Sequence, residues 1–232
     1  MKVLFCNIAW MRWYKGVIPN VDVPVNGGSF VNENQDGSEC DNFWKVPIVA
    51  DCVVDDTNVV VPKGNMDYGP KSVIPKGDIC FGFVEAGHTN NNSRQLRLEN
   101  IHDCSAYKKE ATVEDVLVVF CATREGDRYP KVVGWYNHAT VYRRHFECLL
   151  DNGDVLWKNM FCKAEDAVLL PVSSRRWQVP RAAIDKYGFG RSNVWYADYN
   201  QHEKVKPWVD SIIDKITNYD GENMRDVMPD EI

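Results

Sequence analysis

Two neighbouring apolar runs limit the fold of this chain more than any other feature. Residues 115–124, DVLVVFCATR, form a run that is too short for most helices and rich in β-branched side chains, so they predict a buried strand. The turn-forming sequence GDRYP follows, and KVVGWYNHATVYRR at 131–144 then predicts one or two further strands. A chain with this unit at its centre is expected to fold around a sheet.

Other apolar segments of the chain predict additional strands. They lie at 3–9, 79–85 and 95–101, and a further short strand is expected near Trp195. Two more strands are expected on either side of a turn at 151–154, where the sequence reads DNGD. The long segment between the first two strands is rich in Asn, Asp, Gly and Pro, which predicts loops with short strands.

Helical signals are fewer and gather in the last third of the sequence. Residues 163–170 predict a short helix, and 180–188 predict a second one that begins at a proline and ends at Gly188. Apolar residues at helical spacing predict an amphipathic helix over 204–219. The residues expected on its apolar face are Val205, Trp208, Ile212, Ile213 and Ile216.

These elements predict an α+β fold, namely a small mixed β-barrel with peripheral short helices and a C-terminal amphipathic helix. With 232 residues, of which 44% are hydrophobic, the chain is long enough for one large domain with a real core. We expect that domain to span 1–202, with a loop-rich insertion at about 30–78. Residues 203–232 would then form the terminal helix and an acidic tail.

Charge and cysteine placement narrow the class of protein. The formal charge is -6, which argues against a protein that coats nucleic acid without specificity, because such binding needs many phosphate contacts. Several of the eight cysteines lie in apolar, strand-like runs and are expected to be small buried hydrophobes in a reducing compartment. Neither a signal peptide nor a run of ~18 apolar residues is found. We therefore expect a cytoplasmic protein without a membrane partner.

The motifs of common enzyme classes are missing from the sequence. It contains no phosphate-binding glycine loop, no HExxH and no GxSxG. His145, Cys148 and Cys162 could supply three zinc ligands, but no fourth is evident. We therefore predict no catalytic residue, no metal and no cofactor.

Three stretches combine aromatic residues with short polar and basic ones, and they carry the strongest functional signal. They lie at 7–16, 133–144 and 173–197. Aromatic rings provide surfaces on which bases stack, asparagine can read a base edge, and arginine contacts phosphates. If 133–144 forms one unbroken strand, Trp135, Asn137 and Arg143 share a face.

The same segments carry a resemblance to a known family. MKVLFCNIAWMRWYKG, NGGSFVNEN, DVLVVFCAT with VVGWYNHATVYRR, and LLPVSSRRWQVPRA with GFGRSNVWYA resemble PUA-like domains of the EVE and YTH-like type. Such domains look like the modified-base sensors of modification-dependent restriction systems. The resemblance covers most of residues 1–200 and is diffuse, and the chain departs from the compact family pattern in its long early insertion.

The resemblance implies a small barrel that holds a modified base in an aromatic cage, in DNA more than in RNA. No nuclease or NTPase segment is recognisable, so an effector would be fused or separately encoded. The residues implied to bind the base are Trp10, Trp13, Ser29, Trp135, Tyr136, Asn137, Asn193 and Trp195. Those implied to contact phosphates are Arg143, Arg144, Arg175, Arg176, Arg181 and Arg191.

Three other interpretations remain open at this point. The aromatic stretches could simply be core strands with arginines at the surface. The chain could be a hydrolase or nuclease that uses His138 or His145 with Glu147. It could also be a protein-interaction module that docks a partner through the terminal helix and tail.

Overall fold

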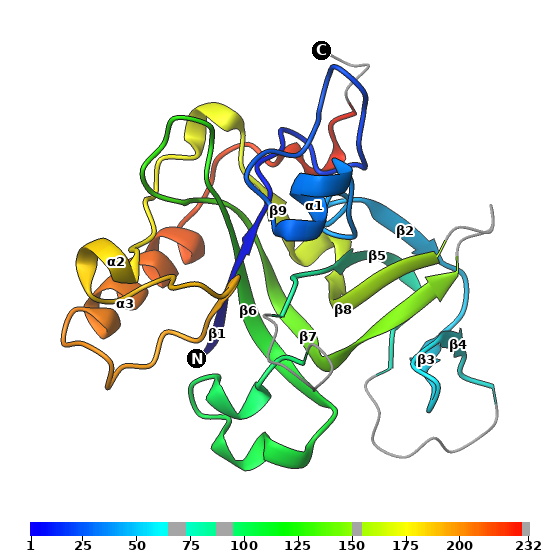
Figure 1. Cartoon of the computed structure of the whole chain (residues 1–232). Coiled ribbons are helices and arrows are strands. Elements are labelled where there is room, and N and C mark those ends of the chain that lie inside the picture. The colour runs from blue at the N-terminus through cyan, green and yellow to red at the C-terminus, as the bar shows by residue number, and fades with distance from the viewer. Residues whose placement is uncertain (65–72, 87–94, 150–154, 229–232) are drawn as a thin grey trace.

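The protein is described from a computed structural model that covers residues 1–64, 73–86, 95–149 and 155–228 (Figure 1). The turn predicted at 151–154 lies outside the described residues. Within them the chain has a mixed α+β fold that consists mostly of sheet, as predicted.

One sheet of eight strands organises the molecule. Its order is β10-β1-β6-β7-β8-β5-β2, and β9 pairs with β7. β1 and β6 are parallel, and the other pairs are antiparallel. A separate pair, β3 and β4, lies beside the far end of β7 and β8 (Figure 1). The strands are β1 (Lys2–Ile8), β2 (Lys45–Ile48), β3 (Cys52–Val54), β4 (Val60–Pro62), β5 (Gly77–Gly82), β6 (Thr112–Ala122), β7 (Lys131–Leu149), β8 (Val155–Lys163), β9 (Ala167–Leu169) and β10 (Val194–Trp195).

The predicted barrel is not confirmed, because the sheet stays open. Among the described residues, no pairing joins the edge strand β2 to the opposite edge strand β10. β2 contains Pro47, which has no backbone N–H to donate, and proline is confined to the edges of sheets for that reason. β10 has only two residues and offers little edge for a further strand.

Three α-helices and several 3₁₀ turns surround the sheet. The α-helices are α1 (Ser29–Asn34), α2 (Ala182–Asp185) and α3 (Val205–Thr217). α2 is shorter than predicted. The helix predicted at 163–170 is wrong, since a 3₁₀ turn at Ala164–Asp166 leads directly into β9. The strand predicted at 95–101 is also wrong: Leu96 and Leu98 are buried, but the segment forms a 3₁₀ turn.

β1 and β6 lie at the centre of the core because both of their faces are buried. On β1, Leu4, Cys6 and Ile8 point into one apolar cluster, while Val3 and Phe5 point into a second. β6 alternates in the same way. A strand buried on both faces reads as a continuous apolar run, which is why these two strands could be predicted from the sequence.

α3 covers the second of these clusters. Its buried residues Val205, Val209, Ile212 and Ile216 belong to the same cluster as Phe5, and Figure 1 shows the helix against one face of the sheet. The predicted amphipathic helix is therefore confirmed. Its apolar face is occupied by the chain's own core, which does not favour a role in docking a partner.

The strand β7 departs from regular alternation at His138. His138 and Asp115 on β6 both have positive φ angles, of 50° and 57°, a conformation that is uncommon for residues other than glycine. The pairing of β6 with β7 shifts register on both sides of Val116, as β-bulges do. The predicted face shared by Trp135, Asn137 and Arg143 therefore does not form as one continuous row.

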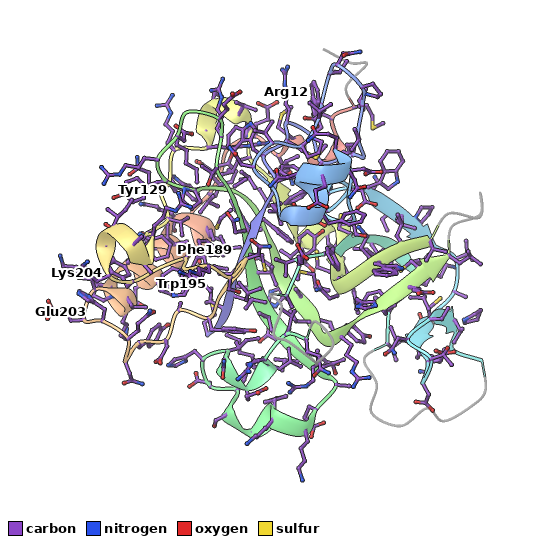
Figure 2. The ribbon with its side chains drawn as sticks, viewed as in Figure 1. Arg12, Tyr129, Phe189, Trp195, Glu203 and Lys204 are labelled. Atoms are coloured by element: carbon purple, nitrogen blue, oxygen red, sulfur yellow. The ribbon has the colours of Figure 1, made fainter. Side chains whose placement is uncertain are left out.

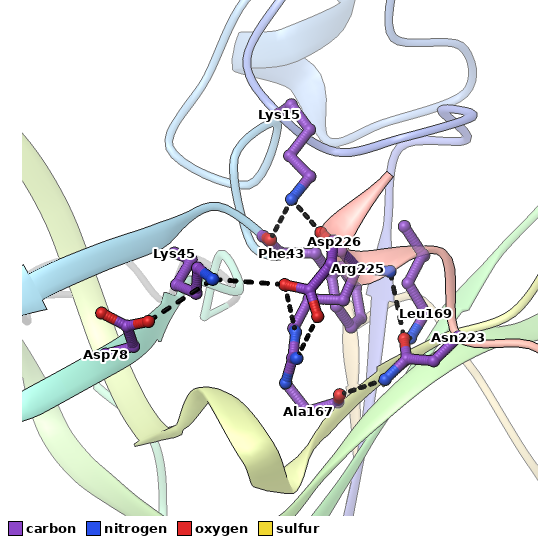
Figure 3. Close-up of polar contacts among 9 residues, drawn as sticks. All are labelled: Lys15, Phe43, Lys45, Asp78, Ala167, Leu169, Asn223, Arg225 and Asp226. Carbon is purple, nitrogen blue, oxygen red and sulfur yellow. Dashed lines mark hydrogen bonds and ion pairs between the residues drawn. The ribbon is translucent and has the colours of Figure 1, made fainter. Parts of the chain in front are cut away.

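The segment after α3 is tied to the sheet by polar contacts (Figure 3). The Asn223 side chain accepts a hydrogen bond from the Leu169 N–H at 3.0 Å and donates one to the Ala167 carbonyl at 2.9 Å. The Lys45 ammonium lies 3.4 Å from carboxylates of both Asp78 and Asp226. These contacts join Asn223 to β9 and Asp226 to Lys45 on β2. The predicted domain boundary at 202 stays a prediction.

We expect Ile212→Ala to destabilise the protein by about 2–5 kcal/mol, because it leaves a cavity in a fully packed cluster. Ile212 is 2% exposed. Ser211→Ala, on the exposed side of the same helix, is the matched control and should change stability by about 0.5 kcal/mol or less. Urea unfolding followed by circular dichroism measures both. Equal, small effects of the two variants would contradict the assignment of α3 to the core.

Candidate nucleic-acid interface

The aromatic residues of 133–144 do not meet in an open pocket. Trp135 and Tyr136 are 1% and 0% exposed and belong to different apolar clusters. Trp135 stacks on Trp177, with ring centroids 5.9 Å apart, and the Tyr136 hydroxyl donates a hydrogen bond to the Asn42 carbonyl. For these two residues the structure matches the interpretation as core strands.

The other aromatic residues implied to form the cage are also dispersed. Trp13 and Trp195 are buried, and Trp10 is half-buried beneath the guanidinium of Arg175, 5.1 Å from its ring centroid. Figure 2 shows Trp195 beside Phe189 and far from Arg12, the neighbour of Trp13. Ser29 is the first residue of α1, and its side chain lies outside the described part of the chain.

Two of the arginines implied to contact phosphates instead bind the protein's own backbone. The buried Arg175 side chain donates hydrogen bonds to the carbonyls of Met11 and Arg12, both at 2.6 Å, and to that of Leu170 at 3.0 Å. Arg143 contacts the Glu99 carboxylate at 2.8 Å and the Tyr107 carbonyl at 2.7 Å. Both side chains therefore fasten loops to the sheet.

The remaining predicted residues divide into those that share a cavity and those that do not. Arg181, Arg191 and Asn193 line one cavity of about 540 Å³. Arg144 and Arg176 are exposed elsewhere, and Asn137 is half-buried on β7. Three predicted residues from the stretch 173–197 are thus brought together. We call this site the asparagine–arginine cavity, and it is lined by Asn7, Asn26, Gly27, Asn32, Thr123, Arg124, Glu125, Gly126, Asp127, Pro130, Arg181, Phe189, Gly190, Arg191, Ser192 and Asn193.

Backbone contacts between distant segments hold this cavity in shape. The Asn7 N–H at the end of β1 donates to the Asn193 carbonyl at 2.7 Å. The Asn26 side chain donates to the Thr123 carbonyl at 3.1 Å, which joins the loop before α1 to the β6–β7 turn. A Cβ on Gly27 would lie 2.9 Å from that of Ala9, so only glycine lets this loop approach β1 so closely.

The charge of the cavity is positive although the chain as a whole is acidic. Three arginines and two acidic residues line it, and one of the acids, Asp127, pairs with Lys131 at 2.8 Å. Arg181 and Arg191 are both exposed. A concave site with a net charge of one sign attracts ligands of the opposite sign, so this cavity suits an anionic ligand with polar edges.

Among the residues of this cavity that sequence reasoning did not single out are Asn7, Asn26, Asn32 and Arg124. All four lie in segments that it quoted, namely the stretch at 7–16, NGGSFVNEN and DVLVVFCATR. The signal that could have identified them is the repeated asparagine at the ends of predicted elements, where side chains from different elements can lie at the same edge of the sheet. Only the fold shows that these ends converge.

A second, smaller pocket lies on the other side of α1. It has a volume of about 280 Å³, and we call it the carboxyl pocket; it is lined by Phe30, Val31, Gly37, Ser38, Glu39, Phe83, Glu85, Val155 and Trp157. Glu39 is 1% exposed, and one of its oxygens accepts a hydrogen bond from the Ala9 N–H at 2.7 Å. Burial, with a smaller contribution from the charge of Glu85, raises the pKa of Glu39 to about 7.

The residues proposed for hydrolysis fall at two places on β7, with His138 beside Asp115 and with His145 and Glu147 both beside Trp157. His138 lies 2.7 Å from the Asp115 carboxylate, whereas the His145 ring stacks on Trp157 with centroids 4.8 Å apart. Glu147 pairs with Trp157 across β7 and β8. Among the described residues, no group of three His, Cys, Asp or Glu side chains could hold a metal ion, and all eight cysteines are free.

Comparison with known proteins yields no relative. No family model, no curated protein and no solved structure matches the chain. The resemblance to EVE-like and YTH-like domains is therefore untested by comparison. In the described part of the chain, no helix is both long enough and apolar enough to cross a bilayer.

We expect Arg175→Met to destabilise the protein by several kcal/mol, because it leaves two buried carbonyls and one partly buried carbonyl without their donor, and a buried group without its partner costs about 1–3 kcal/mol. The neighbouring Arg176→Met removes an exposed arginine and should change stability by about 0.5 kcal/mol or less. Chemical denaturation compares the two variants. If Arg175→Met were as stable as the wild type, the structural role of Arg175 would be refuted.

Glu39 should make stability depend on pH in a defined window. The folded chain keeps the Glu39 proton up to about pH 7, whereas the unfolded chain loses it near the ordinary value of 4.5. The free energy of unfolding should therefore fall as the pH rises from about 4.5 to about 7, by up to about 1.4 kcal/mol per pH unit. Glu39→Gln should flatten this slope. Parallel pH curves for the two chains, measured by thermal and urea unfolding, would show that Glu39 ionises normally.

Proposed function

We propose that this protein is a nucleic-acid-binding module that holds its ligand in the asparagine–arginine cavity. DNA that carries a modified base is the proposed ligand, and a restriction or defence effector is the proposed partner. The assignment to a PUA-like fold of the EVE or YTH-like type is part of the same proposal. Its support is the sequence resemblance, together with a sheet-based fold that carries an open cavity.

One observation carries the proposal. Arg181, Arg191 and Asn193, which the sequence implies as ligand-binding residues, all line the same cavity. The fold adds Arg124 and three further asparagines to them. A wall that combines arginines with side-chain amides matches the two kinds of group that a nucleotide presents, phosphate oxygens and base edges.

The acidic body of the protein is consistent with selective binding. A formal charge of -6 weakens contacts with nucleic acid outside the positive cavity, because nonspecific binding is dominated by electrostatic contacts with phosphates. A small number of exposed arginines would then set the affinity. Recognition of a modification would have to come from a separate pocket that encloses the base, because extruded bases are read by stacking and by edge contacts.

The structure offers less support for the two other functions. In the hydrolase interpretation, His138 pairs with Asp115, and among the described residues no group of three His, Cys, Asp or Glu side chains could hold a metal ion. The interaction-module interpretation depends on α3, whose apolar face is buried in the core. We therefore propose no catalytic activity for this chain.

We expect Arg181→Gln and Arg191→Gln each to weaken binding to modified and unmodified oligonucleotides alike. Each should also reduce the slope of log K against log salt concentration by about 0.9 for duplex DNA, since each removes one phosphate contact. Fluorescence anisotropy at several salt concentrations measures both quantities. The oligonucleotides are identical apart from a methyl group on one cytosine or one adenine.

Arg176→Gln is the matched control, because Arg176 is an exposed arginine outside the cavity. It should leave both the affinity and the salt slope unchanged. Binding that is weak, equal for all oligonucleotides and indifferent to the three substitutions would overturn the proposed function.

A further inference from the structure

The carboxyl pocket combines exposed aromatic rings with carboxyl groups. Phe30 and Trp157 line it and are 53% and 44% exposed, which leaves large aromatic surfaces open to a ligand. His145 stacks on Trp157 with an interplanar angle of 9°, so the indole is supported from β7. Aromatic rings that are exposed at the mouth of a pocket are suited to stacking on a planar ring.

Two carboxyl groups line the same pocket. Glu39 lies at its buried end and Glu85 is half-buried. The main cation near Glu39 is Lys158, which is itself paired with Asp41. The elevated pKa of Glu39 reflects its apolar surroundings, where a hydrogen bond to a carboxyl group is stronger than in water. Above about pH 7, where Glu39 is ionised, its carboxylate can only accept hydrogen bonds, so a ligand that enters this pocket must then present hydrogen-bond donors.

The pocket comes close to the asparagine–arginine cavity at Gly28. A Cβ on Gly28 would lie 2.4 Å from the Glu85 carboxylate and 3.4 Å from the Asn193 side-chain nitrogen. Glu85 lines the carboxyl pocket, and Asn193 lines the asparagine–arginine cavity. The backbone at Gly28 thus lies between a residue of each site, so one nucleotide could reach both.

We infer that the carboxyl pocket receives one nucleobase that bears an exocyclic amino group, which stacks between Phe30 and Trp157 and donates hydrogen bonds to Glu39 and Glu85. Its volume of about 280 Å³ lies just below the range of about 300–1,000 Å³ that holds drug-sized ligands. A base with a keto group in place of the amino group would turn an oxygen toward the carboxyl groups. Sites built to receive a donor reject such analogues strongly.

This inference rests on the proposed function for its biological setting, but free nucleosides test it separately. The probes are two pairs that differ in the amino group, cytidine with uridine and adenosine with inosine. Titrations at about pH 8, where Glu39 is ionised, are followed through the indole N–H signals of ¹⁵N-labelled protein. The Trp157 signal is assigned by its loss in Trp157→Ala. We expect cytidine and adenosine to shift this signal and to bind at least tenfold more tightly than their keto partners.

Two matched pairs of variants control the titration. Trp157→Ala should weaken cytidine binding at least tenfold, whereas Trp44→Ala should not, because Trp44 is 43% exposed and lies outside the pocket. Glu39→Gln should weaken it similarly, whereas Glu33→Gln, on the exposed side of α1, should not. Glu85→Gln provides a second test of the carboxyl groups if Glu39→Gln lowers stability.

The outcomes separate this inference from the proposed function. If the nucleosides bind as expected but oligonucleotides show no dependence on Arg181 and Arg191, the carboxyl pocket stands and the proposed function fails. If amino and keto nucleosides bind equally, or if neither shifts the Trp157 signal, the inference is overturned even where oligonucleotides bind. The double variant Arg181→Gln/Arg191→Gln should retain nucleoside binding, since a nucleoside has no phosphate.

Discussion

Burial of both faces of β1 and β6 is the constraint on which the rest of the structure depends. A parallel pair at the centre of a sheet needs cover on each side. α3 supplies it on one side, where Val209 and Ile212 pack with Phe5. Residues Tyr14, Val31 and Phe43, from the long segment after β1, supply it on the other. Because that segment must return over the sheet, the loop at 26–28 is carried to the end of β1.

The position of both candidate sites follows from this arrangement. The loop before α1 passes between Glu85 and Asn193. It therefore lies between the asparagine–arginine cavity and the carboxyl pocket, to which these two residues belong. The asparagine–arginine cavity is built from the ends of strands and the adjoining loops, where side chains and backbone groups do not take part in the hydrogen bonds between strands. The carboxyl pocket is built from α1, the segment after it and one face of β8. Neither site requires the large buried tryptophans of the core.

Apolar runs allowed the central strands and α3 to be predicted, because burial on one or two faces leaves a periodic trace in the sequence. The barrel could not be excluded in this way, since closure depends on whether the edges pair, and Pro47 lies at one edge. The predicted face of β7 failed at His138, where a bulge shifts the alternation. The sequence around Trp135 does not reveal which residues pack on its ring, so the predicted place of Trp135 in a cage could not be tested without the fold. The predicted phosphate contact of Arg175 is wrong for a similar reason, because its partners are backbone carbonyls, which have no sequence signature.

Gly28 has a consequence for how mutations in this protein should be interpreted. Its backbone touches the walls of two sites, and a side chain there would displace the Glu85 carboxylate first and crowd Asn193 next. A substitution at this residue would therefore perturb two recognition surfaces at once, and its phenotype could not be attributed to either. The roles of the asparagine–arginine cavity and the carboxyl pocket can therefore be separated only by substitutions at lining residues that lie away from Gly28.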